Sequence, residues 1–107
     1  MKKWQSRAEF KAHVRGWAKK LDMEIRTISI RIMKNKWASF TKANRLLIFN
    51  ADLLNMDQAL GDYVIVHELL HFSVPNHGRL WKSLMRAHLG DYEALEAKLN
   101  RRTLVKD

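Results

Sequence analysis

Apolar residues recur along the first part of the chain at the spacing of one face of an α-helix. The intervals of four, three and four residues between them form one amphipathic stripe. The stripe consists of Phe10, Val14, Trp17 and Leu21. Ser6 precedes it and Glu9 follows three residues later, a pairing typical of a capping box at a helix start. We therefore expect an N-terminal helix that begins after Ser6 and buries this stripe.

Alternation of apolar and polar residues replaces the helical period after this segment. The isoleucines at 28, 30 and 32 alternate with polar residues, as in a strand with one buried face. Residues 37–41 and 45–50 predict two further strands, and short polar turns separate the three. The pattern therefore predicts a small antiparallel sheet of three strands, connected as a meander.

A long and mainly apolar segment predicts a central helix near residues 57–73. Asn55 or Asp57 is its candidate N-cap, because both residue types favour that position. Pro75 ends the helix, since proline has no amide donor and pushes the preceding residue out of helical geometry. We expect this helix to run through the core of the protein.

Two shorter helical patterns complete the chain. They predict helices from about Gly78 to Leu89 and from about Asp91 to Arg102, and Gly90 suits the end of the first. A length of 107 residues fits a single domain with a modest core. The expected fold is a small α+β domain over residues 1–107, with an N-terminal helix, three strands, a central helix and two C-terminal helices.

The central helix carries an HExxH motif, His67-Glu68-Leu69-Leu70-His71. Histidines four residues apart project from one face of a helix, so both imidazoles can reach one metal ion. Glu68 lies beside them, where it can accept a proton from a water molecule. This combination is typical of zinc metallopeptidases, with Glu68 as general base. The alternative is a pair of ordinary helix histidines, which Glu68 and the apolar surroundings disfavour.

A catalytic zinc ion usually has three protein ligands and one open position. His77 lies six residues after His71 and just beyond Pro75, where the chain can double back toward the metal. The spacing therefore favours His77 as third ligand. Two alternatives stay open: His77 is an exposed turn histidine, or Glu93 or Glu96 on the last helix is the third ligand instead.

Charge is unevenly distributed along the sequence. Residues 1–45 contain 13 lysines and arginines against three acids, whereas residues 46–107 contain seven against eight. A cationic block of this kind indicates contact with nucleic acid, although solvated surface charge explains the same residues. The candidate contacts are Lys11, Arg15, Lys19 and Lys20 in the first helix and Lys34, Lys36 and Lys42 in the turns.

The composition also limits the compartment and the chemistry. Cysteine is absent, which excludes disulfides and cysteine zinc ligands and fits a cytoplasmic protein. The apolar runs are too short for a membrane span, and no apolar segment of a secretory signal follows the basic start. We expect a cytoplasmic protein without membrane contact; its oligomeric state is left open.

Further motifs surround HExxH in a definite order. Residues 63–66, Tyr-Val-Ile-Val, lead into it, and residues 75–78, Pro-Asn-His-Gly, follow it. Leu80-Trp81 and Gly90-Asp91-Tyr92 come next, and residues 33–39 upstream are Met-Lys-Asn-Lys-Trp-Ala-Ser. With these motifs in this order, the sequence closely resembles the YgjP-like metallopeptidases, which are related to the SprT-like group.

The resemblance implies a minimal zincin-like fold in which His67, His71 and His77 bind zinc and Glu68 is the catalytic base. The implied reaction is hydrolysis of a peptide bond in a peptide or protein substrate. Some SprT-like relatives are DNA-dependent proteases, so a rival hypothesis is a nucleic-acid-associated protein or DNA-dependent protease that uses the basic N-terminal half. A zinc-stabilised domain without catalysis is disfavoured, because a structural site needs no base.

Overall fold

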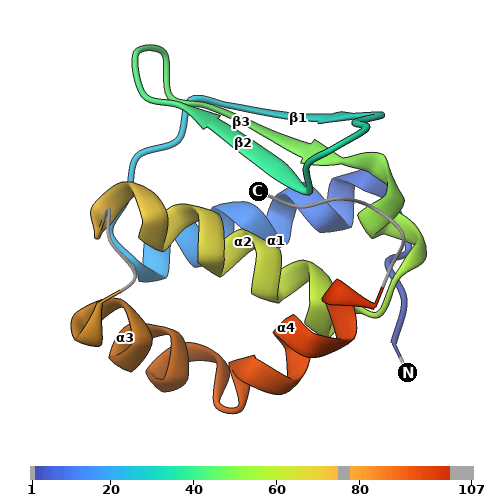
Figure 1. Cartoon of the computed structure of the whole chain (residues 1–107). Coiled ribbons are helices and arrows are strands. Elements are labelled where there is room, and N and C mark those ends of the chain that lie inside the picture. Colours follow the sequence, from blue (N-terminus) through green and yellow to red (C-terminus); the bar gives the residue numbers. More distant parts are fainter. Residues whose placement is uncertain (1, 75–77, 102–107) are drawn as a thin grey trace.

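The computed structural model describes residues 2–74 and 78–101. A three-stranded sheet lies over two helices, and two further helices cover the opposite side of the central helix α2 (Figure 1). In chain order the elements are α1 (Arg7–Lys20), β1 (Thr27–Arg31), β2 (Ala38–Thr41), β3 (Leu46–Asn50), the 3-10 helix η1 (Ala51–Asn55), α2 (Gln58–Ser73), α3 (Arg79–Leu89) and α4 (Tyr92–Asn100). The predicted α+β architecture is confirmed, and η1 is an additional short element.

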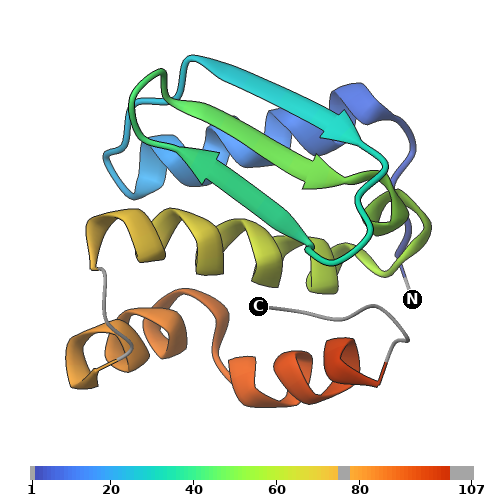
Figure 2. The ribbon, with the colours of Figure 1, turned by 45° about the horizontal axis from the view of Figure 1, so that its top comes forward.

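The sheet is mixed, so the prediction of an antiparallel meander was wrong. Its strand order is β1-β3-β2. β2 and β3 form the expected antiparallel hairpin, but β1 pairs with β3 in parallel, with Ile28 opposite Leu47. The physical reason is the apolar character of β3, whose Leu47 and Phe49 are fully buried, because the most apolar strand gains most from the central position. β1 and β2 are consequently the two edges of the sheet (Figure 2).

The connection from β1 to β2 passes the end of β3, where Asn50 holds it. The Asn50 side chain is buried, and its amide donates to the carbonyl oxygens of Met33 at 3.0 Å and Lys36 at 2.9 Å. Its Oδ1 accepts from the backbone N–H of Asp52 at 3.0 Å. One buried side chain therefore joins backbone groups of the crossing connection and of η1.

Helix α1 begins at the predicted cap. The Ser6 hydroxyl accepts from the Glu9 N–H at 3.1 Å, and the Glu9 carboxylate accepts from the Gln5 N–H at 2.6 Å. The carboxylate thus caps the residue before Ser6 and not Ser6 itself. The helix buries Phe10 and Val14 toward the sheet, where the ring centroids of Phe10 and Phe49 are 5.1 Å apart.

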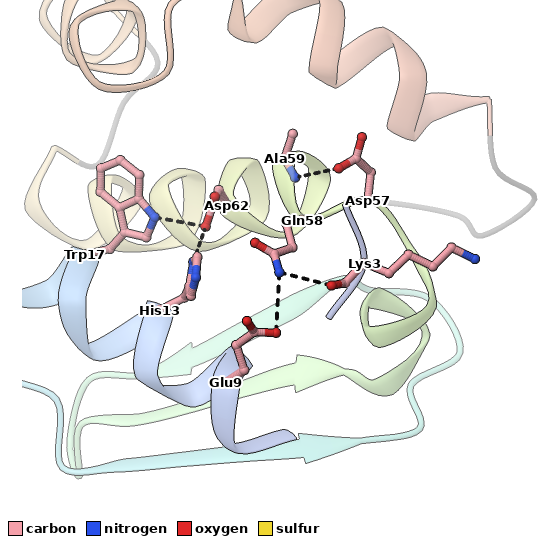
Figure 3. Close-up of polar contacts among 8 residues, drawn as sticks. All are labelled: Lys3, Glu9, His13, Trp17, Asp57, Gln58, Ala59 and Asp62. Carbon is pink, nitrogen blue, oxygen red and sulfur yellow. Dashed lines mark hydrogen bonds and ion pairs between the residues drawn. The ribbon is translucent and has the colours of Figure 1, made fainter. Parts of the chain in front are cut away.

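Helix α2 is buried on most of its surface and is held to the N-terminal part of the chain by polar contacts (Figure 3). The Asp57 side chain caps it by accepting from the Ala59 N–H. Gln58 donates to the carbonyl of Lys3 at 3.0 Å. Asp62 accepts from Trp17 Nε1 at 3.1 Å. These contacts fix the rotation of α2 about its axis, and this rotation decides which of its side chains face outward.

Helix α2 packs very closely against the N-terminal segment at one glycine. A Cβ atom added at Gly61 of α2 would lie 2.6 Å from Cζ2 of Trp4, so only glycine allows this approach.

No helix within residues 2–74 and 78–101 has the length and apolarity needed to cross a membrane. The last helix ends at Asn100, two residues before the predicted end at about Arg102. Two predicted features lie outside the described residues: the helix stop at Pro75 and the ligand His77.

Candidate active site

A cleft of about 600 Å³ opens between strand β2 and helix α2. The β2 side contributes Ala38 and Phe40, and the α2 side contributes all three polar residues of the HExxH motif. Helix α4 closes the remaining side. The α4 residues that line the cleft are Glu96, Leu99 and Asn100. The cleft therefore lies between one edge strand of the sheet and two helices that are distant in the sequence.

His67, Glu68 and His71 are half-buried side chains that line this cleft together. The imidazole centroids of His67 and His71 are 4.7 Å apart, as expected for residues one helical turn apart. Leu69 and Leu70, which lie between the two histidines in the sequence, are buried in the core. The apolar positions of α2 thus orient the helix so that its polar motif faces the cleft.

Trp81 of α3 lies against both histidines. Its ring is 3% exposed and packs edge-on against His67, with centroids 5.2 Å apart, and it lies 6.3 Å from His71. Tyr92 of α4 packs edge-on against the other side of Trp81 at 6.0 Å. The aromatic layer restricts the rotamers of the two imidazoles.

Tyr63 and Glu96 form a polar pair in the same cleft that the sequence analysis did not predict. The Tyr63 hydroxyl donates to Glu96 Oε2 at 3.2 Å. Burial raises the pKa of Tyr63, and the adjacent Glu96 carboxylate raises it further, so the hydroxyl remains a donor at neutral pH. The sequence contained a signal that Glu96 points inward, because Glu96 lies on the same helical face as Tyr92 and Leu99, which are buried.

The two downstream carboxylates have different positions. Glu96 is half-buried in the cleft, whereas Glu93 is exposed and forms a salt bridge of 3.0 Å with Arg86. In the described part of the chain, no three His, Asp or Glu side chains converge closely enough to hold a metal ion. Glu96 as placed therefore does not complete a site with His67 and His71.

Comparison with known proteins identifies the class to which this site belongs. The chain matches the YgjP-like metallopeptidase domain over residues 1–102 and belongs to this family. An uncharacterised protein of Methanocaldococcus jannaschii is 36% identical over 75 residues, which cover 67% of this chain and 68% of that protein. The predicted resemblance is confirmed, and the protein is a metallopeptidase.

Two crystal structures have the same fold. The metallopeptidase zymogen of Methanocaldococcus jannaschii jannalysin is 31% identical, with a TM-score of 0.77 and coverage of 86% of this chain and 94% of that chain. The metallopeptidase zymogen of Pyrococcus abyssi abylysin has a TM-score of 0.77 at 13% identity and covers 92% and 99%. At this lower identity the second comparison shows the shared fold alone.

Proposed function

We propose that this metallopeptidase is a zinc enzyme, folded as one domain over residues 1–107, which hydrolyses peptide bonds. His67 and His71 are its first two metal ligands, His77 is the third, and Glu68 is the general base. The observation that carries the proposal is the joint placement of the His67, Glu68 and His71 side chains in one cleft beneath an edge strand.

The donor set fits zinc. Two imidazoles lie 4.7 Å apart with a carboxylate beside them, and the chain has no cysteine that would favour a closed structural site. When bound, zinc would supply a Lewis acid that polarises the substrate carbonyl and lowers the pKa of a water molecule toward about 7. Glu68 would accept a proton from the attacking water and deliver it to the leaving amine.

The edge strand β2 is the proposed docking site for the substrate backbone. β2 pairs with β3 on one side only, and its residues Ala38 and Phe40 line the cleft above Glu68. An extended peptide can add to such an edge through main-chain hydrogen bonds, which bind without requiring a particular sequence. This arrangement would position the scissile bond over the histidines.

The test of the general base is the variant Glu68→Gln. It is expected to retain zinc and the fold but to lose about 10²- to 10⁴-fold in kcat, because the amide cannot accept the proton. Glu93→Gln is the matched control, since Glu93 is exposed and outside the cleft. Peptide hydrolysis and metal content are measured for both. Unchanged turnover in Glu68→Gln with full zinc content would reject the role of general base.

The test of the third ligand compares His77→Ala with Glu96→Gln. The spacing of the motif favours His77, and Glu96 is already engaged by the Tyr63 hydroxyl. We therefore expect His77→Ala to lose most of about one zinc per chain and Glu96→Gln to retain it. Mass spectrometry of the metal content checks this, and the opposite result would make Glu96 the ligand.

A second function is proposed from the outer face of α1, namely weak and sequence-independent binding of nucleic acid. Four cations at intervals of four residues form one exposed stripe on this helix. They are Arg7, Lys11, Arg15 and Lys19. None of the four forms a salt bridge within the described residues. From Arg7 to Lys19 the stripe is about 18 Å long at 1.5 Å per residue, enough to contact several successive phosphates.

A charge-reversal pair tests this second function. Lys11→Glu with Arg15→Glu should weaken binding of a labelled duplex and a labelled single strand at low salt by about tenfold or more. Arg79→Glu with Lys82→Glu on α3 is the control with the same change of net charge. Equal loss in both variants would show that only the net charge matters, and the absence of micromolar binding by the wild type would reject the proposal.

A further inference from the structure

Beyond His71 the cleft reaches a place where two cations share one aromatic ring. Phe72 of α2 lines the cleft and packs edge-on against Phe40 of β2, with ring centroids 4.7 Å apart. Lys42 Nζ lies 5.8 Å and Arg45 Cζ lies 4.7 Å from the centre of the Phe72 ring. Both cations come from the turn that joins β2 to β3. We call Lys42, Arg45 and Phe72 the cationic end of the cleft.

Neither cation is neutralised by an acidic side chain of the described residues. Within residues 2–74 and 78–101, the salt bridges involve neither Lys42 nor Arg45. Arg45 is half-buried and donates to the carbonyl of Glu24 at 3.4 Å, which holds its guanidinium over the ring. Lys42 is exposed and lines the cleft directly. Two cations at the rim of a cleft with apolar walls produce a positive potential that attracts an anionic side chain.

The opposite end of the cleft has the opposite character. Tyr63 lies nine residues before Phe72 on α2, which is about 13 Å along the helix axis. There the hydroxyl of Tyr63 donates to the carboxylate of Glu96, which lines the same cleft. Among the described residues, no lysine or arginine lines this end, and Lys42 is the one lysine or arginine that lines the cleft. The cleft is therefore polarised along its length, from cationic beyond His71 to acidic beside Tyr63.

The direction of β2 relates this polarity to the direction of a bound peptide. β2 and α2 run in the same direction (Figure 2). Phe40 of β2 contacts Phe72 near the end of α2, so β2 finishes at the cationic end of the cleft and begins toward the Tyr63 end. Antiparallel strand pairing is slightly more stable per residue than parallel pairing. A peptide paired antiparallel with β2 would enter at the cationic end with its N-terminal part and leave past Tyr63 with its C-terminal part.

We infer that Lys42 and Arg45, with Phe72 as an apolar base, form a substrate subsite that selects an aspartate or glutamate side chain on the N-terminal side of the scissile bond. The inference rests on the proposed hydrolysis of peptides in this cleft and names the substrate class. Lys42 is the main specificity residue, because it faces the cleft directly. Arg45, which is not among the residues that line the cleft, adds positive charge at the Phe72 ring.

Matched peptides that differ at one position test the subsite. Each carries Glu, Gln or Lys at successive positions before the scissile bond, and kcat/KM is measured for each. Partly exposed ion pairs contribute only a small free energy, so we expect the Glu peptide to be cleaved about three- to tenfold faster than the Gln peptide at one of these positions. This rate ratio should decrease at high salt, which screens the charges. Lys42→Glu should reverse the order of the Glu and Lys peptides. Lys82→Glu, with the same net charge but outside the cleft, should preserve it.

Binding to the variant Glu68→Gln separates this inference from the proposed function. Labelled Glu and Gln peptides are titrated by fluorescence anisotropy, with and without Lys42→Glu added. A preference for Glu that Lys42→Glu removes would support the subsite even if no peptide is hydrolysed, in which case the proposed function fails alone. Hydrolysis with equal rates for Glu and Gln peptides, or a preference that survives Lys42→Glu, would overturn the subsite alone. A preference for acids only after the scissile bond would overturn its N-terminal placement.

Discussion

Helices α1 and α2 pack side by side against the same sheet, yet they have different environments. α1 buries three of its fourteen residues, whereas α2 buries nine of its sixteen. The outer face of α1 is open to solvent, while α2 is enclosed by the sheet, α1, α3 and α4 (Figure 1). The same type of element is therefore amphipathic in one case and buried on most sides in the other.

This difference in burial decides whether a polar residue on the helix indicates a functional site. The exposed cations of α1 are solvated at little cost, so their presence by itself is no sign of a binding site. A polar side chain on α2 costs free energy unless it is paired or lines a cavity. Gln58 and Asp62 are paired with the N-terminal part of the chain. The polar residues of the HExxH motif line the cleft, which is why the motif carries functional information.

The largest expected effect comes from the buried side of α2. Leu69 lies within the HExxH motif but is fully buried. Leu69→Ala should lower the free energy of unfolding by about 3 kcal/mol, from lost burial and the cavity left behind. Glu68→Gln, the adjacent position on the cleft side, should change it by less than about 0.5 kcal/mol. Urea denaturation followed by circular dichroism measures both. Similar losses in the two variants would remove the distinction between the core and cleft faces.

The next effect concerns the connection that sets the sheet order. Asn50→Ala removes three hydrogen bonds and leaves the carbonyls of Met33 and Lys36 without their partner. We expect a loss of about 2 kcal/mol, which is the scale for losing three hydrogen bonds of one buried side chain. Asn44→Ala, in the exposed turn between β2 and β3, is the control and should be nearly neutral. An equal stability of both variants would contradict the structural role of Asn50.

A smaller effect is expected where α2 meets the N-terminal segment. Gly61→Ala adds a methyl group 2.6 Å from the Trp4 ring. Overpacking costs about 1–3 kcal/mol, and the better helix propensity of alanine returns up to about 1 kcal/mol. The net result should be a loss of about 1 kcal/mol, measured by thermal or urea unfolding. Gly16→Ala in α1 meets no atom within 4 Å and should instead stabilise the fold. Stabilisation by both substitutions would contradict the close packing at Gly61.

The smallest effect is expected on the outer face of α1. Arg15 is exposed and forms no salt bridge within the described residues. Arg15→Ala should change the free energy of unfolding by less than about 0.5 kcal/mol, and it should leave peptide hydrolysis unchanged. A loss of more than about 1 kcal/mol would mean that this face packs against another surface, and the contrast between α1 and α2 would no longer hold.

The sequence by itself determined the features that depend on neighbouring residues. The caps at Ser6 and Asp57 lie at their predicted positions, because capping is a contact between residues two or three apart. The shared face of His67 and His71 follows from their separation by one helical turn. The family was also recognisable, since its motifs are short segments in a definite order. These properties are local along the chain, so a single sequence specifies them.

The tertiary structure decided what depends on contacts between distant segments. Alternation predicted three strands but not the central place of β3, because strand order depends on which strand gains most from burial on both sides. The helical period puts Glu93 and Glu96 on different faces of α4, but only the packing of α4 against α2 brings the Glu96 face to the cleft. Lys42 is one of seven candidate cations in the sequence, and the packing of the β2–β3 hairpin against α2 brings it beside Phe72. Each of these outcomes depends on the packing of segments far apart in the chain, which no local pattern encodes.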